Sequence, residues 1–409
     1  MDAREARGRQ LARSTRIERV GRHWAVPSQT TTDRYLVNIE DALCTCPDYS
    51  LRKGTCKHQH AVYYWIAWGR DVGADGVVTE TVTVKRKTYP QRDWSAYRES
   101  QHHERTYVER LLRDLCVRIP QPPRKPGPGR NRRLLADLVF EAVMKMYTGL
   151  PGSRLIPDLE ASAAKGYLHT VGHENSIHNF LASSDTTPLL ISLIEEASIP
   201  LGAIENGQYA IDSTGMSPCT YDRYYSFKHQ GVTAHRDFVK LHIMAGTSTH
   251  VISGVKITSA GDSKQLEELL AQTRKHHTVR ELSGDKAYSS IEHHAMLEQM
   301  GIAAFIPFKD NAVLHAQPDA WSRKLCEFLL RRDYWLPHYH RRSNVETVFS
   351  MMKTKFGGAI RARRPTSQIN EVLCKCLAHN LCCLVKAIFM SGLAPTFWDD
   401  AKPMLTVVP

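Results

Sequence analysis

The spacing of apolar residues divides the chain into regions with different secondary structure. Between residues 134 and 205, apolar side chains recur at helical intervals in several short stretches that Gly, Pro and Ser separate. These stretches predict a compact group of helices, a context that suits a helix-turn-helix, although no stretch identifies a groove-reading helix. After residue 205, short apolar runs alternate with helical stretches, so strands and helices are expected within one α/β region.

The α/β region has a definite order of elements. Strands are expected at GQYAIDSTG, FVKLHIMAG, THVISGVKITSA, the stretch that ends at Asp285, and IAAFIPFK. Helices are expected at DSKQLEELLAQTRKH, at IEHHAMLEQMG before a glycine stop, and from residue 339 onward. This order predicts a mixed sheet flanked by helices.

The part of the chain before residue 134 follows a different pattern. HWAVPSQTTTDRYLVNIEDALC predicts two strands around a polar turn, and HAVYYWIAWG predicts a short apolar helix. Residues 1–19 contain many arginines and are expected to form an exposed or disordered basic arm. Residues 117–133 are rich in Pro and Gly, with six basic and no acidic side chains, and predict a linker. A basic segment of this kind can also lie along a DNA minor groove.

These patterns together predict seven segments. They are a basic arm (1–19), a small finger (20–72), a strand and charged-helix extension (73–116), a basic Pro/Gly linker (117–133), a helical domain that is a candidate for DNA binding (134–205), an α/β domain (206–392) and a tail (393–409).

Charge and composition narrow the possible partners. The chain has 54 Lys and Arg against 42 Asp and Glu, a net charge of +12, which favours a polyanionic partner such as nucleic acid. We expect no membrane span, because LCCLVKAIFM, the most apolar stretch, is interrupted by Lys386 and suits a buried helix. The N-terminal residues lack the apolar region of a secretory signal, so a cytoplasmic or nuclear location is expected. The ten cysteines should then be thiols or metal ligands.

Three of the cysteines and one histidine are closely spaced. Cys44, Cys46, Cys56 and His58 form a C-x-C pair and a C-x-H pair separated by nine residues. Three thiolates and one imidazole complete the tetrahedral shell of a structural zinc. His60 is an alternative to His58. A ββα unit this small needs the metal to fold, whereas the other cysteines form no second closed set and suit a buried core.

Residues 20 to 70 resemble a SWIM zinc finger. The resemblance rests on the Cys44-x-Cys46-Pro-Asp and Cys56-Lys-His58 pairs, with aromatic and apolar residues on the preceding strands. It implies a structural, non-catalytic zinc and a role in binding DNA or protein.

Three carboxylates in the α/β region suit a metal centre. Asp212 and Asp285 are each expected at the C-terminal end of a strand, and Glu346 is expected on a helix over the sheet. Three such groups repel one another unless cations are present. Their typical use is to hold two divalent ions that act on a phosphodiester, and magnesium suits oxygen ligands.

Other residues nearby offer weaker candidates. Asp262 is expected to cap a helix and Asp237 to precede its strand on the surface. Lys286, beside Asp285, suits either a phosphate contact or an ion pair and stays unassigned.

The helix that carries Glu346 also carries basic and aromatic residues on the same side. In YHRRSNVETVFSMMK, a helix that reaches back to Tyr339 places Tyr339, Arg342, Glu346 and Lys353 within a stripe roughly 60° wide. Taken alone, Arg342 and Glu346 also suit an ordinary surface ion pair.

Residues 134 to 390 resemble a DDE transposase of the insertion-sequence type. The Tyr-Arg-Glu-Lys spacing of Tyr339, Arg342, Glu346 and Lys353 matches that family at every position, and AIDSTG and GDKAY provide the two aspartates. The resemblance implies a ribonuclease-H-like mixed sheet flanked by helices. The expected fold class is therefore α/β, preceded by a helical domain and the small zinc-stabilised finger.

The resemblance also implies roles for these residues. Asp212, Asp285 and Glu346 would be catalytic acids that hold magnesium or manganese, and Tyr339, Arg342 and Lys353 would contact the DNA of the element end. The implied reaction is hydrolytic nicking followed by joining of the 3′-hydroxyl to target DNA, in at least a homodimer. The alternatives are a domesticated DNA-binding protein and a ribonuclease-H-fold nuclease that cuts without strand transfer.

Overall fold

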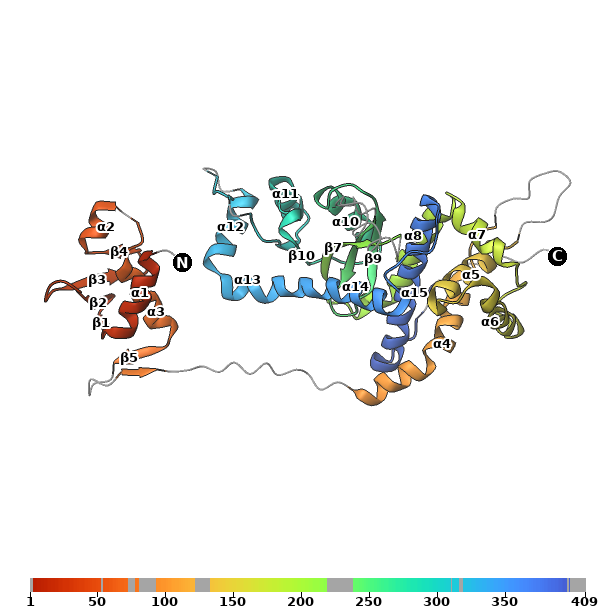
Figure 1. Cartoon of the computed structure of the whole chain (residues 1–409), viewed down its shortest axis with the longest axis horizontal. Helices are drawn as coiled ribbons and strands as arrows, with labels where there is room; N and C mark the ends of the chain where they lie inside the picture. The colour runs from red at the N-terminus through yellow and green to blue at the C-terminus, as the bar shows by residue number, and fades with distance from the viewer. Residues whose placement is uncertain are drawn as a thin grey trace, which may run out of the picture. The chain divides into compact units, whose positions relative to one another are not determined.

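The protein consists of two compact units, shown in Figure 1. In this computed structural model the described residues are 3–52, 54–72, 78–80, 93–121, 133–218, 238–309, 311–315, 319–395 and 397. The first unit spans Met1–Gln91 and the second spans Arg92–Pro409. The expected linker at 117–133 and the tail at 393–409 lie largely outside the described residues.

The first unit is a small antiparallel sheet covered by helices. Strands β1 (Glu18–Val20), β2 (His23–Pro27), β3 (Arg34–Asn38) and β4 (Leu43–Cys44) lie side by side in this order. Helix α2 (Pro47–Arg52) and helix α3 (Lys57–Ala67) follow, and β5 (Arg70–Val72) pairs with β6 (Val78–Glu80). The expected ββα arrangement is present, with additional elements on both sides of it.

Helix α1 (Ala3–Ser14) occupies the segment that was expected to be an exposed or disordered arm. That expectation is wrong, because Leu11 and Ala12 are fully buried among the residues of the finger core. Gly8 lies on the same side of the helix, and a Cβ atom there would approach Cβ of His60 on α3 to 2.4 Å. Helix α1 therefore packs closely on α3, and Arg9 lies over the ring of Tyr64 on that helix.

The second unit begins with helices that share one hydrophobic core with the sheet. They are α4 (Trp94–Cys116), α5 (Leu135–Thr148), α6 (Gly152–Ala164), α7 (Glu174–Ala182), α8 (Thr186–Ser198) and η1 (Ile199–Ala203). Several of them pack on the C-terminal helix α15 (Pro365–Ser391). The expected helices are present. The expected domain boundary at residue 205 does not separate two hydrophobic cores, because one cluster of buried residues includes both these helices and strands of the sheet.

The sheet of the second unit has the strand order β11-β10-β7-β8-β9. Strands β7 (Gln208–Met216), β8 (Val239–Gly246) and β9 (Ile252–Ile257) form an antiparallel meander. Strands β10 (Glu281–Gly284) and β11 (Ala303–Phe305) continue the sheet parallel to β7. Three antiparallel strands followed by two parallel ones make a ribonuclease-H-like mixed sheet, so the expected fold class is confirmed.

The two faces of this sheet are covered by different helices. On β7, Ala210 and Met216 belong to the core that includes α14 (Ser343–Phe356) and α15, whereas Tyr209 and Ile211 belong to a second core. That second core includes residues of α10 (Leu266–Arg274) and α11 (Ile291–Gln299). Because side chains alternate along a strand, Asp212 and Thr214 lie on the α14 face and Ser213 on the opposite face.

A helical segment connects β11 to α14. It consists of α12 (Ala320–Leu330), α13 (Arg332–Tyr339) and the short helix η4 (His340–Arg342). Phe308, Trp321 and Leu325 form a small hydrophobic cluster of its own. Figure 1 shows that α13 and α14 follow each other in nearly the same direction, with η4 between them.

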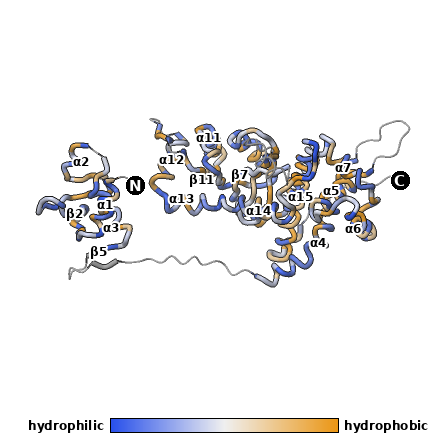
Figure 2. Tube along the Cα trace, viewed as in Figure 1, coloured by the Kyte–Doolittle hydropathy of each residue, from blue (hydrophilic) through white to orange (hydrophobic). Residues whose placement is uncertain are grey.

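Helix α15 is the central helix of the second unit. By length and composition it could cross a membrane, and it is the one such helix among the described residues. However, 78% of its most apolar window is buried inside the protein, and core helices pass the same test. The apolar stretch is longer than the sequence pattern indicated, and most of its side chains are buried. Figure 2 shows the hydropathy of each residue along the trace.

Helix α15 also contains a buried ion pair, which leads to a stability prediction. The Glu371 carboxylate accepts hydrogen bonds from the backbone amides of Arg361 (3.1 Å) and Ala362 (2.9 Å) and lies 3.4 Å from Lys375 Nζ. Lys375 donates to the carbonyls of Gly357 and Ala359. Both side chains are only 3% exposed, so replacing one of them leaves a buried charge uncompensated.

We expect Glu371→Ala to destabilise the second unit by about 3–5 kcal/mol. The double substitution Glu371→Leu with Lys375→Met should be less destabilising, because neither charge remains in the core. Differential scanning calorimetry of the full chain measures both variants. A Glu371→Ala variant with the melting temperature of the wild-type protein would contradict the proposed stabilising role of this ion pair.

Candidate active site and zinc centre

Cys44, Cys46, Cys56 and His58 meet in the first unit. One ligand atom from each lies within 4.8 Å of the others, and all four side chains are buried. Cys44 is the last residue of β4, Cys46 follows it, and Cys56 and His58 open helix α3. The expected set of four residues is therefore brought together by the strand end and the helix start.

The chemistry of this cluster fits a structural zinc. His58 Nε2 is buried and has no hydrogen-bond partner among the described residues. Hydrogen bonding from Cys44 lowers the pKa of Cys56 to about 3, and the same contact raises the pKa of Cys44. A buried group of three thiols and an unpartnered imidazole suits the tetrahedral coordination of Zn²⁺. The His58 ring also packs on Tyr35, with ring centroids 4.7 Å apart, which holds its orientation.

The cysteines of α15 belong to the protein core, as expected. Cys374 and Cys376 are completely buried, and burial raises the pKa of both thiols. His379 Nε2 lies 2.9 Å from the carbonyl of His250, and Cys383 Sγ lies 3.4 Å from the same nitrogen. Within the described residues, the first-unit cluster is the one group of His, Cys, Asp and Glu close enough to share an ion.

Asp212 and Asp285 lie on neighbouring parallel strands. Ile211 of β7 pairs with Gly284 of β10, so the residues that follow them stand at the same level, about 4.8 Å apart in the sheet direction. Asp285 comes directly after β10, as expected. Asp212 does not end β7, which continues to Met216 beside β8. The expectation of a strand end fails because pairing with β10 stops at Ile211 while pairing with β8 continues.

Each aspartate also accepts a local backbone hydrogen bond. Asp212 Oδ1 accepts from the amide of Ser213 at 2.8 Å, and Asp285 Oδ1 accepts from the amide of Lys286 at 2.7 Å. Each carboxylate thus keeps its second oxygen for another partner.

Arg342 connects Asp212 with Glu346. Its Nη1 donates to Asp212 Oδ2 at 2.9 Å, and its Nη2 donates to Glu346 Oε1. The Asp212 side chain is 20% exposed, whereas Glu346 is 53% exposed. The Arg342–Glu346 pair is therefore more than a surface contact, because the same guanidinium holds a half-buried carboxylate of the sheet.

The charges at this site influence one another. Burial raises the pKa of Asp212, and the charges of Asp285 and Glu346 raise it further, against the Ser213 amide and Arg342. Burial lowers the pKa of Arg342, but the negative charges of Asp212 and Glu346 have the larger effect, so its pKa is raised. The three acids and Arg342 thus form one electrostatic group in which excess negative charge is only partly neutralised.

Lys353 and Tyr339 lie at the two ends of this group. Lys353 Nζ donates to Thr214 Oγ1 at 2.6 Å, two residues beyond Asp212 on the same face of β7. Tyr339 stacks on Trp335, with ring centroids 5.1 Å apart. A helix-like path from α13 through η4 to α14 places Arg342, Glu346 and Lys353 over β7, as the stripe predicts.

The remaining candidates lie elsewhere. Asp262 makes no side-chain cap, which corrects the expected role. Its carboxylate lies 2.8 Å from Lys240 Nζ and 3.3 Å from His242 Nδ1 on the adjacent strand. Lys286 is exposed, and Asp237 lies outside the described residues.

Sequence reasoning missed Tyr288, which is 1% exposed and whose hydroxyl has no hydrogen-bond partner among the described residues. Burial raises its pKa, as do the charges of Asp262, Asp212 and Asp285. The signal available in the sequence was its position three residues after Asp285 in GDKAY. It closes the sheet face opposite α14.

The carboxylates of Asp212, Asp285 and Glu346 are suitable ligands for divalent cations. In this structure Arg342 is the cation that pairs with two of them. Three carboxylates are the donor set that magnesium prefers. They do not converge as tightly as the thiols of the finger, because the guanidinium lies between two of them.

The strand order defines a ribonuclease-H-like fold, in which Asp212 lies on β7 and Asp285 follows the neighbouring strand β10. Comparison with family models identifies its branch: residues 206–381 match the transposase DDE domain, and residues 35–64 match the SWIM zinc finger. The chain therefore contains a transposase DDE domain and a SWIM zinc finger, and both domains imply DNA binding. Comparisons with curated proteins and with solved structures gave no match.

Proposed function

We propose that the protein is an active transposase that binds the ends of its own element, nicks them and joins the freed 3′-hydroxyl to target DNA. The observation that supports this most is the single group formed by Asp212, Asp285 and Glu346 around Arg342. A domesticated protein that only binds DNA would have no need of all three acids.

Asp212, Asp285 and Glu346 are proposed to hold magnesium or manganese. Bound divalent ions would supply an activated attacking oxygen and stabilise the leaving oxygen of the phosphodiester. The half-buried carboxylate of Asp212 is held in place by the Ser213 amide. Glu346, being more exposed, is free to adjust its position on α14.

Arg342 is proposed to exchange partners during the reaction. Without cations, it pairs with both Asp212 and Glu346 and partly neutralises them. Once the acids have other counterions, the guanidinium is available for bidentate contact with a DNA phosphate near the cut. Lys353 and Tyr339 would contact the same strand, Lys353 as a point charge and Tyr339 by stacking or hydrogen bonding.

The finger is proposed to hold a structural zinc and to bind DNA or a protein partner, separately from catalysis. Joining two element ends would take at least two copies of the chain. The protein would act where its DNA is, in the cytoplasm of a prokaryote or in a nucleus.

A joining assay tests this function. Purified protein, magnesium and the DNA that bounds its own gene are incubated with a target plasmid, and products are separated on gels. We expect joined products that require the divalent ion. Cutting without joining would indicate a ribonuclease-H-fold nuclease, and binding without cutting would indicate a domesticated DNA-binding protein.

A further inference from the structure

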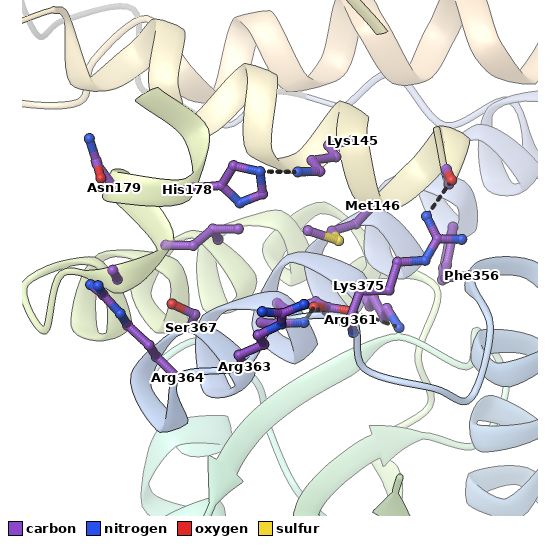
Figure 3. A pocket seen from close by; sticks show the side chains of 15 residues that line it. Lys145, Met146, His178, Asn179, Phe356, Arg361, Arg363, Arg364, Ser367 and Lys375 are labelled. Carbon is purple, nitrogen blue, oxygen red and sulfur yellow. Dashed lines mark hydrogen bonds and ion pairs between the residues drawn. The ribbon is translucent and has the colours of Figure 1, made fainter. Parts of the chain in front are cut away.

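A basic pocket lies in the second unit at the far end of α14 from Glu346. Its cavity has a volume of about 390 Å³. Figure 3 shows Lys145 of α5, His178 and Asn179 of α7, and Arg361, Arg363 and Arg364 of the loop between α14 and α15 around it. The proposed chemistry at the three acids does not use this pocket.

The charge of the pocket is strongly positive. Its one acidic side chain, Glu371, is taken up by Lys375 and by the amides of Arg361 and Ala362. This leaves Lys145, Arg361, Arg363 and Arg364 without a carboxylate partner among the described residues. The surplus of positive charge favours an anionic ligand.

Two of these arginines are available to a ligand. Arg363 and Arg364 are exposed, and their guanidinium groups make no hydrogen bond or ion pair with the described residues. Arg361, in contrast, donates to the carbonyl of Gly149 at 2.7 Å, and Lys145 Nζ lies 3.3 Å from His178 Nε2. The loop is therefore held firmly by Arg361 and Glu371 while it presents Arg363 and Arg364.

The interior of the pocket is apolar. Met146, Leu181, Ala182 and Phe356 line it together with the aliphatic part of the basic side chains. A phosphate alone would need only the cations, and the cavity has the volume of a small-molecule site. An apolar interior with a cationic rim suits a flat base joined to a phosphate, because a base stacks on apolar surface while its phosphate meets the arginines.

The position of the pocket relates it to DNA at the acids. Phe356 lies ten residues after Glu346 on the same helix, a rise of about 15 Å along α14. This rise corresponds to about four base pairs of duplex at 3.4 Å each. Lys353, between the two, donates to Thr214 of β7.

We propose that this pocket binds one unpaired nucleotide of the DNA, about four base pairs from the cut, with its base against Met146 and Phe356 and its phosphate on Arg363 and Arg364. The proposal rests on the proposed function for the identity of the DNA. Asn179, which is exposed and offers both a donor and an acceptor, is placed to meet the base edge.

The test compares two labelled duplexes of the same arbitrary sequence, one fully paired and one with a single unpaired nucleotide. Binding to the full chain is measured by fluorescence anisotropy without a divalent ion, so no cutting is required. We expect the bulged duplex to bind about tenfold more tightly. Ala182→Trp, which fills the pocket without changing charge, should remove this preference and leave binding of the paired duplex unchanged.

Two further variants separate the base from the phosphate. Arg363→Ala with Arg364→Ala should weaken both duplexes and lower the dependence of log K on log salt by about 2. The matched control is Lys264→Ala with Arg274→Ala, which removes one exposed cation just before α10 and one at its last residue and should preserve the bulge preference. Asn179→Leu, at an exposed position, should reduce the preference without filling the cavity.

Several results would overturn the proposal. If the wild-type chain shows no bulge preference, or a correctly melting Ala182→Trp keeps it, the pocket takes a backbone phosphate only. Displacement of the bulged duplex by free dAMP at micromolar concentration would assign the pocket to a mononucleotide instead of DNA. Because the assay needs no cleavage, a preference in a protein that fails the joining assay refutes the proposed function and keeps this inference.

Discussion

Removing zinc is expected to unfold the first unit of the protein and to leave the second unit folded. The hydrophobic core of the first unit is small, and three of its buried residues are the thiols Cys44, Cys46 and Cys56. Structural zinc in a finger contributes an apparent binding free energy of about 10–16 kcal/mol, which is also folding free energy. Without the ion, the buried thiols and the unpartnered His58 nitrogen have no compensation for burial.

Metal analysis should find about one zinc per chain in the wild-type protein and none in Cys44→Ser. Limited proteolysis should then cut this variant within residues 3–72 much faster than wild type. The matched control is Cys326→Ser, which changes a cysteine of α12 outside the cluster and should retain both zinc and resistance. A zinc-free protein with a protease-resistant first unit would contradict the predicted role of the metal.

The finger could be predicted in detail because its information is local. Four ligands lie within fifteen residues, and short strands with a tight spacer fix how they meet. Helix α1 was missed for the opposite reason. Its composition is that of a solvated basic segment, and only the packing of Gly8, Leu11 and Ala12 against α3 reveals its place.

The acidic site was predictable as a set of residues but less so in its contacts. A family spacing identifies Glu346, and alternating apolar runs place Asp212 and Asp285 on strands. No pattern shows that Arg342 reaches across to Asp212, 130 positions earlier in the chain. Asp262 was misread for a similar reason, since a cap position in the sequence does not exclude an ion pair with Lys240 of another strand.

The same limit applies to the helical region. Its helices could be predicted from the helical spacing of apolar residues and from the Gly, Pro and Ser residues between them. Their assignment to a separate domain is wrong, because α15, far along the chain, packs against both these helices and the sheet. The basic pocket could not be foreseen either, since α5, α7 and the loop before α15 build it from distant segments.

Asp212→Asn should abolish DNA cutting while making the metal-free protein more stable. Loss of a ligand for divalent cations removes several kcal/mol of transition-state stabilisation, a decrease of about a thousandfold or more in rate. The stability effect follows from burial, which raises the pKa of Asp212 above its ordinary value of 3.8. The ionised side chain therefore costs free energy in the folded protein at neutral pH.

The sign of the pH dependence follows from proton binding. Between pH 3.8 and the raised pKa, the folded state holds the Asp212 proton more tightly than the unfolded state does, so stability falls as pH rises through this window. Above the window, the cost stays constant. Asp212→Asn removes it, so this variant should melt above wild type at pH 7 without a divalent ion and lose the advantage in acid.

Magnesium should reverse the order of stability of the two proteins. An ion that binds only the folded state adds about 1–3 kcal/mol at saturating concentration, and it should raise the melting temperature of wild type but not of Asp212→Asn. Asp333→Asn, which removes an exposed carboxylate of α13, is the matched control and should cut DNA and respond to magnesium as wild type does. An Asp212→Asn protein that cuts at the wild-type rate would remove this carboxylate from the catalytic group, whatever its effect on melting.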